Sequence, residues 1–86
     1  MSTPDVLMYL KSTCPFCTAA QRLLKSKGVR WQEVSLLSEP QRRDEMIERS
    51  GRRTVPQIFI GDTHVGGFDD LQALDEAGKL DLMLNA

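Results

Sequence analysis

The two cysteines of this chain, Cys14 and Cys17, are the residues whose type and spacing point most directly to chemistry. They stand in the stretch Lys11-Ser12-Thr13-Cys14-Pro15-Phe16-Cys17, where a short apolar run gives way to apolar residues at helical spacing. Proline is favoured in the first turn of a helix, so we expect Cys14 at the N-cap and Cys17 one turn further in. The two sulfur atoms then face each other.

The expected position of Cys14 favours its ionised form. At a helix N-terminus the sulfur meets unpaired backbone N–H groups and the positive end of the helix dipole, and Lys11 adds a cation nearby. The thiolate is the attacking species in thiol chemistry. We therefore assign Cys14 as the nucleophile and Cys17, which lies inside the helix and is less exposed, as the thiol that resolves a mixed disulfide.

Three other roles for the cysteine pair stay open at this point. A structural disulfide between Cys14 and Cys17 would close a loop of only a few residues, and such a loop gives little stabilisation by chain entropy. A structural zinc site normally takes four protein ligands, and His64 is the only further histidine or cysteine, so no metal site is predicted. Two buried inert thiols are the third alternative, although Lys11 and Pro15 favour an exposed, electropositive setting.

The rest of the chain supplies the elements that must position the cysteines. Apolar patterns predict strands over residues 6–10, 31–36, 55–60 and 63–66, with Gly61-Asp62 turning the last two into a hairpin. Helices are predicted over about residues 16–27, from a capping box at Ser38 to Gly51, and from an N-cap at Asp69 to Gly78. Residues 80–84 should add a short final turn. His64 is expected to be an exposed hairpin residue.

The element order β-α-β-α-β-β-α predicts a small α/β fold in a single domain over residues 1–86. A helical crossover joins the first two strands, which should therefore be parallel, and the last two strands form an antiparallel hairpin. Trp31 is most simply a core or rim packing residue.

The charge balance argues against whole classes of partner. Eleven basic and twelve acidic residues give a net charge of −1, and no basic residues interleave with aromatic ones, so nucleic acid or anionic membrane binding has no global electrostatic support. Basic residues do gather locally, at Arg42, Arg43, Arg49, Arg52 and Arg53.

With no basic leader and no apolar run of membrane-spanning length, we expect a cytoplasmic protein. In the cytoplasm a C-x-x-C motif is more often redox-active or metal-binding than structural.

Three motifs give the chain a family resemblance over nearly its whole length: Cys14-Pro15-Phe16-Cys17, Thr54-Val55-Pro56 and Gly66-Gly67-Phe68-Asp69-Asp70. With these motifs the chain resembles the glutaredoxins, most closely the small bacterial dithiol type. The resemblance implies a thioredoxin-like fold with a small mixed four-stranded sheet flanked by helices, and a cis Pro56 facing the active site. Phe16 stands where many dithiol members have tyrosine, and Phe68 where several have a small residue or an extra cysteine.

The resemblance also implies a glutathione site. Val55 would pair through its backbone with the cysteinyl part, while Gly67, Phe68, Asp69 and Asp70 would meet the γ-glutamyl end. Lys11 and Arg43 match positions that hold the glycine carboxylate. The remaining residues of the predicted site are Phe16, Thr54 and Pro56. No cofactor should be bound permanently, since glutathione acts as the reducing co-substrate.

The resulting hypothesis is a monomeric, glutathione-dependent thiol–disulfide oxidoreductase that reduces protein–glutathione mixed disulfides and protein disulfides. Ribonucleotide reductase is the kind of partner that the resemblance suggests. One alternative is a thioredoxin-like electron carrier that a reductase protein reduces. A second is an iron–sulfur cluster carrier in which two chains each give Cys14 and glutathione supplies the other ligands, although Pro15 is atypical of such relatives. A domain with a purely adaptor role is the third.

Overall fold

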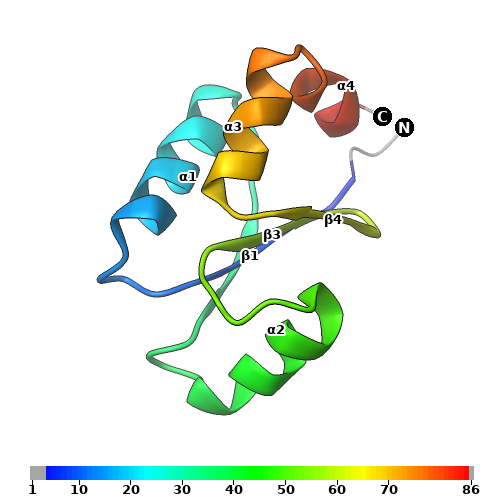
Figure 1. Ribbon diagram of the computed structural model, residues 1–86. Helices are drawn as coiled ribbons and strands as arrows, with labels where there is room; N and C mark the ends of the chain where they lie inside the picture. The colour runs from blue at the N-terminus through cyan, green and yellow to red at the C-terminus, as the bar shows by residue number, and fades with distance from the viewer. Residues whose placement is uncertain (1–3, 86) are drawn as a thin grey trace.

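The computed structural model describes residues 4–85, which form one four-stranded mixed sheet with helices on both faces (Figure 1). The strands are β1 (Val6–Leu10), β2 (Gln32–Ser35), β3 (Gln57–Ile60) and β4 (Thr63–Gly66), in the spatial order β2-β1-β3-β4. β1 pairs parallel with β2 and antiparallel with β3, and β3 pairs antiparallel with β4. The predicted parallel crossover and hairpin are both confirmed.

The helices are α1 (Pro15–Ser26), α2 (Arg43–Ser50), α3 (Phe68–Glu76) and α4 (Leu80–Leu84). Figure 1 shows α1, α3 and α4 together on one side of the sheet and α2 on the other. None of the helices within residues 4–85 is long and apolar enough to cross a lipid bilayer.

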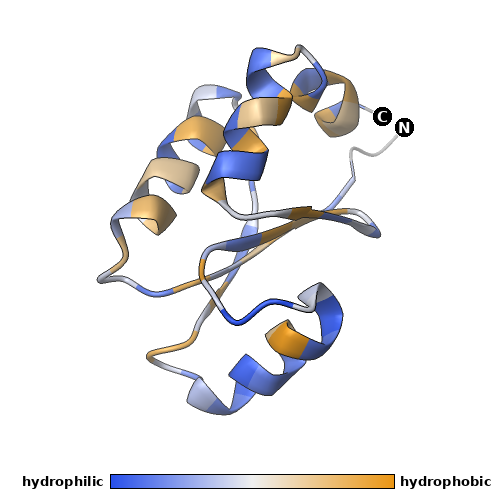
Figure 2. Cartoon of the chain, in the orientation of Figure 1, coloured by the Kyte–Doolittle hydropathy of each residue, from blue (hydrophilic) through white to orange (hydrophobic). Residues whose placement is uncertain are grey.

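Each face of the sheet has its own buried core, because side chains alternate along a strand. On β1, Met8 packs into the core under α1, α3 and α4, whereas Tyr9 packs into the core under α2. The α2 core is the smaller of the two: Tyr9, Val34, Leu36, Met46 and Phe59. Figure 2 shows why, since α2 is mostly hydrophilic and carries a single hydrophobic section.

The predicted capping box at Ser38 is wrong. The chain instead makes a 3₁₀ turn over Pro40–Arg42, and α2 begins only at Arg43, without a side-chain cap. Arg42 joins the turn to the helix by ion pairs to Glu39 and Glu45, with N–O distances of 3.4 and 2.9 Å. The proline therefore opens a tighter turn before the α-helix, which displaces the helix start beyond the reach of Ser38.

Two further expectations need correction. α3 begins at Phe68, so its N-cap is Gly67, and the predicted N-cap Asp69 lies inside the first turn. His64 is half-buried and not exposed, because its ring packs on Phe59 with a centroid distance of 4.9 Å. Trp31 is partly buried against the larger core, as expected.

The attachment of α2 to the sheet should depend strongly on Met46, the one fully buried residue of this helix. Replacing a buried methionine by alanine leaves a cavity, so we expect Met46→Ala to lower the free energy of unfolding by about 2–5 kcal/mol. Urea denaturation followed by circular dichroism measures the loss. The exposed Glu48→Ala on the same helix is the control, and an equal effect of both variants would contradict the proposed anchoring.

Candidate active site

Cys14 occupies the N-cap of α1 in an extended backbone conformation, as the sequence predicts. Its sulfur accepts a hydrogen bond from the Cys17 N–H at 3.3 Å, in the role that a serine or aspartate oxygen usually has at a cap. The Cys14 N–H donates to the Lys11 carbonyl at 3.2 Å, which fixes the turn before the helix. Both cysteines are free thiols, and Cys14 is partly exposed.

Cys17 lies one turn into α1 with only 1% of its surface exposed. Burial, followed by its hydrogen bond with Cys14, raises the pKa of the Cys17 thiol to about 12, against a weaker lowering by Lys11. Cys17 is therefore a protonated thiol at neutral pH. The two sulfurs differ in access: Cys14 can meet a substrate from solution, whereas Cys17 is sheltered behind it.

A second segment, far away in sequence, faces Cys14. The Cys14 thiol donates to the Val55 carbonyl across 3.7 Å, and the Val55–Pro56 peptide bond is cis, as the family resemblance implies. Residues 54–56 connect α2 to β3. Cys14 thus lies against an irregular segment whose backbone groups are not taken up by the sheet.

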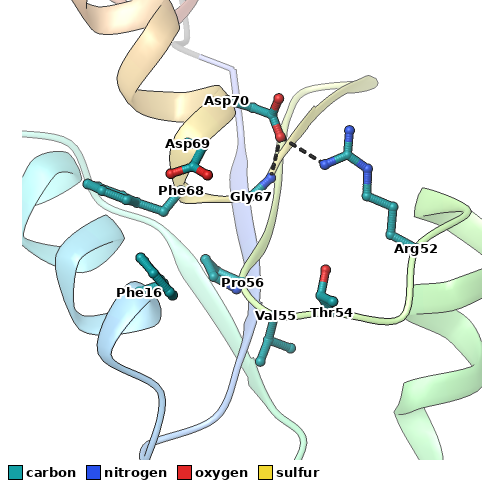
Figure 3. A pocket seen from close by; sticks show the side chains of 9 residues that line it. All are labelled: Phe16, Arg52, Thr54, Val55, Pro56, Gly67, Phe68, Asp69 and Asp70. Carbon is teal, nitrogen blue, oxygen red and sulfur yellow. Dashed lines mark hydrogen bonds and ion pairs between the residues drawn. The ribbon is translucent and has the colours of Figure 1, made fainter.

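A cavity of about 300 Å³ opens beside these segments (Figure 3). Its lining comes from α1, from the segment between α2 and β3, and from the first turn of α3: Phe16, Arg52, Thr54, Val55, Pro56, Gly67, Phe68, Asp69 and Asp70. The rings of Phe16 and Phe68 stack with centroids 6.4 Å apart, and Phe16 is 60% exposed. Figure 3 shows this aromatic pair on one side and Arg52 and Asp70 on the other.

The charged side of the cavity is organised by Asp70. Its Oδ2 atom accepts from the Gly67 N–H at 3.0 Å and from Arg52 Nη1 at 2.8 Å. These two donors, Arg52 first, lower the pKa of Asp70, so the carboxylate is ionised at neutral pH. Gly66 has a φ of 117°, and a Cβ there would lie 2.3 Å from Asp70 Oδ2. Only glycine leaves room for this arrangement.

The structure brings most of the predicted site residues together. Eight of them line the cavity: Phe16, Thr54, Val55, Pro56, Gly67, Phe68, Asp69 and Asp70. Lys11 and Arg43 are not among the described residues that line the cavity. Sequence reasoning did not single out Arg52 for the site. The available signal was its place in the local basic group, two residues before Thr54.

Within residues 4–85, no three His, Cys, Asp or Glu side chains gather in an arrangement that could hold a metal ion. The groups that the cavity offers to a ligand are the backbone of residues 54–56, the N–H groups at the start of α3, the Arg52–Asp70 pair and the aromatic wall. They suit a small molecule that carries both charges and an extended backbone.

Comparisons with family models, with curated proteins and with solved structures all find similarity to glutaredoxins. The glutaredoxin family model matches residues 6–65. A glutaredoxin of Pseudomonas aeruginosa is 51% identical over 83 residues, covering 96% of this chain and 99% of the relative. Glutaredoxin 3 of Escherichia coli is 55% identical over 80 residues, covering 93% and 96%. A crystal structure of a buckwheat glutaredoxin–glutathione complex matches with a TM-score of 0.88 and 31% identity, covering 94% of this chain and 76% of that one.

The difference between the two thiols should be visible in alkylation. At pH 7 iodoacetamide should label Cys14 and leave Cys17 unmodified, because Cys17 is buried and its pKa is about 12. Mass spectrometry of the intact and digested protein should show one adduct, and the Cys14→Ser protein should show none over the same time. In urea both cysteines should react. Rapid double labelling of the folded protein would contradict this assignment.

Asp70 should make the protein sensitive to acid. A carboxylate whose pKa is lowered by folding stabilises the protein above the unfolded pKa of about 3.9, and this contribution is lost as the pH falls through the folded pKa. The free energy of unfolding of the wild type should therefore fall more steeply on acidification than that of Asp70→Asn. Urea denaturation at a series of pH values tests this. Asp69→Asn is the matched control and should follow the wild type.

Proposed function

This chain belongs to the glutaredoxin family, and we propose that it uses glutathione to reduce protein–glutathione mixed disulfides and protein disulfides. Family membership makes it a thiol–disulfide oxidoreductase with a thioredoxin-like fold. The observation that supports the use of glutathione is the position of the partly exposed Cys14 sulfur at the N-terminus of α1. The cavity beside it offers charged groups and backbone groups that suit a small peptide.

In the first step the Cys14 thiolate attacks the glutathionyl sulfur of a mixed disulfide. The new sulfur–sulfur bond joins Cys14 to glutathione, the old bond breaks, and the client thiolate leaves and takes up a proton. The Cys17 N–H and the dipole of α1 stabilise the Cys14 thiolate before attack.

The cavity offers matching groups for the rest of glutathione. The Val55 backbone lies opposite Cys14 and suits the cysteinyl part. The start of α3 supplies N–H groups for the γ-glutamyl carboxylate, and Asp70, already paired with Arg52, suits the ammonium group. The buckwheat glutaredoxin, whose structure is a complex with glutathione, supports this choice of ligand. A role of Lys11 and Arg43 at the glycine carboxylate stays a prediction.

A second glutathione then attacks the glutathionyl sulfur on Cys14, which releases oxidised glutathione and restores the thiolate. With a protein disulfide as substrate, the Cys14 thiolate attacks one client sulfur to form a mixed disulfide, and the other client sulfur leaves and takes up a proton. Cys17 then gives up its proton and attacks the Cys14 sulfur, which breaks the mixed disulfide and releases the client as a dithiol. Two glutathiones then reduce the Cys14–Cys17 disulfide. Because Cys17 is buried and its pKa is high, its attack has to be intramolecular, so the route that uses Cys14 alone should dominate with glutathionylated substrates.

Several features of the proposal come from the sequence and the family and stay predictions. They are a monomeric state, one domain over residues 1–86, a cytoplasmic location and a client such as ribonucleotide reductase. No permanently bound cofactor is required by the steps above, since both electrons come from glutathione thiols.

The proposal is tested by reduction of a glutathionylated peptide with the wild type, Cys14→Ser and Cys17→Ser. Without the nucleophile, Cys14→Ser should lose activity by about 10³-fold or more. Cys17→Ser should still turn over and should be trapped with one glutathione on Cys14, which mass spectrometry detects.

The opposite result identifies the main competitor. If Cys17→Ser is inactive, forms no adduct, and the wild-type rate does not depend on glutathione concentration, the protein is a carrier that a reductase reduces. An active Cys14→Ser protein would exclude both redox mechanisms.

A further inference from the structure

Gln57, the first residue of β3, is the only polar or charged side chain among residues 4–85 that is fully buried, with 0% of its surface exposed. A buried amide costs free energy unless its groups are hydrogen-bonded. A methionine or leucine of similar volume would fill the same space at lower cost. The amide therefore calls for an explanation beyond packing.

The hydrogen bonds of Gln57 fix which way its amide points. Its Nε2 atom lies 3.0 Å from the Thr54 carbonyl oxygen, which can only accept, so the NH₂ group must face Thr54. A longer contact of 3.4 Å joins the same nitrogen to Thr54 Oγ1. The amide thus ties the start of β3 to the residue that precedes Val55 and the cis Pro56.

The other end of the amide defines the state of His64 on the neighbouring strand. Gln57 Oε1 must accept, and it lies 2.7 Å from His64 Nε2, so Nε2 carries a proton. Burial, and after it the charge of Arg52, lower the pKa of His64 against a weaker opposite effect of Asp70. The imidazole is therefore neutral at pH 7, and its single N–H points at Gln57.

The imidazole is itself held in place. Its ring packs on Phe59 at a centroid distance of 4.9 Å, and the guanidinium of Arg49 lies 4.5 Å from the same Phe59 ring on the α2 side. The result is a continuous chain of contacts from the sheet to the cavity: Phe59, His64, Gln57 and Thr54.

On the basis of this chain, and resting on the function proposed above, we propose that Gln57 and His64 are positioning residues for the substrate site. The pair holds residues 54–56 so that the Val55 backbone stays opposite the Cys14 sulfur. Neither side chain lines the cavity between Phe16 and Asp70, so both act through Thr54. They should therefore govern how well the substrate binds and leave the reactivity of Cys14 unchanged.

The first test separates positioning from stability. Gln57→Met keeps the volume and removes both hydrogen bonds, so KM for a glutathionylated peptide should rise roughly three- to tenfold, as expected for the loss of one or two hydrogen bonds. The value of kcat and the rate of Cys14 alkylation should stay near wild type. Ile58→Val, a core substitution on the opposite face of β3, is the control that destabilises without touching Thr54.

The second test uses His64. His64→Phe keeps a ring against Phe59 and loses the N–H, so it should reproduce the KM of Gln57→Met. His64→Gln keeps a donor for Gln57 Oε1 and should restore KM toward wild type. A KM that follows the loss of stability in every variant, Ile58→Val included, would overturn the proposal.

The third test does not depend on activity. Nitrogen-15 NMR of the wild type should show His64 protonated at Nε2 and unprotonated at Nδ1, and nitrogen-15 relaxation should give lower order parameters for the Thr54 and Val55 amides in Gln57→Met. The Nδ1–H tautomer, or unchanged order parameters, would refute the positioning role. If the wild type fails to reduce the glutathionylated peptide while these signatures appear, the proposed function falls and the positioning role stands.

Discussion

The hydrogen bond from the Cys17 N–H to the Cys14 sulfur is the contact on which the site depends. It places a sulfur atom where α1 has unpaired N–H groups and a positive dipole, and it sets the two thiols one turn apart. Pro15 begins the helix directly after Cys14, and the buried strand β1 fixes the place where the helix begins. The same geometry leaves Cys14 partly exposed and buries Cys17, so the two thiols differ in their access to solvent.

The sheet topology decides what Cys14 faces. β3 runs antiparallel to β1 with Gln57 opposite Tyr9, so the start of β3 lies at the edge where β1 ends. β4 returns antiparallel to β3, and its end therefore reaches the same edge. Three segments that adjoin the ends of these strands meet there: the turn to α1, the segment with Val55 and the start of α3. The segment with Val55 and the N-terminus of α3 thus line one cavity (Figure 3), and Cys14 lies beside it, in contact with the Val55 carbonyl.

The cavity divides into an aromatic wall and a charged side, and the two sides rest on different supports. Phe16 and Phe68 need only their places at the starts of α1 and α3. The Arg52–Asp70 pair needs Gly66, because any Cβ at that position would meet the Asp70 carboxylate. The segment between the two sides, residues 54–56, is joined to β3 and β4 by hydrogen bonds: Gln57 donates to the Thr54 carbonyl and accepts from His64. The cap at Cys14, the charged side of the cavity and the segment with Val55 are therefore held by separate sets of contacts.

The sequence by itself determined the local features: β1, the N-cap at Cys14, the hairpin, the end of α2 at Gly51 and the three motifs of the family. These depend on residues within about one turn of each other, where spacing and residue type suffice. The sequence pattern wrongly predicted Asp69 as the N-cap of α3, which is Gly67. The choice between adjacent helix starts depends on contacts made in the folded protein, here those of Asp70 with the Gly67 N–H and with Arg52.

The tertiary structure alone decided the contacts that span long stretches of chain. Arg52 reaches Asp70 across 18 residues and the Cys14 thiol reaches Val55 across 41, while Lys11 and Arg43 stay off the cavity lining. His64 is half-buried only because the strand register sets it beside Phe59 and Gln57. Such contacts follow from strand order and register, which are set by how the two cores pack on the sheet and are not encoded in any one short stretch of sequence.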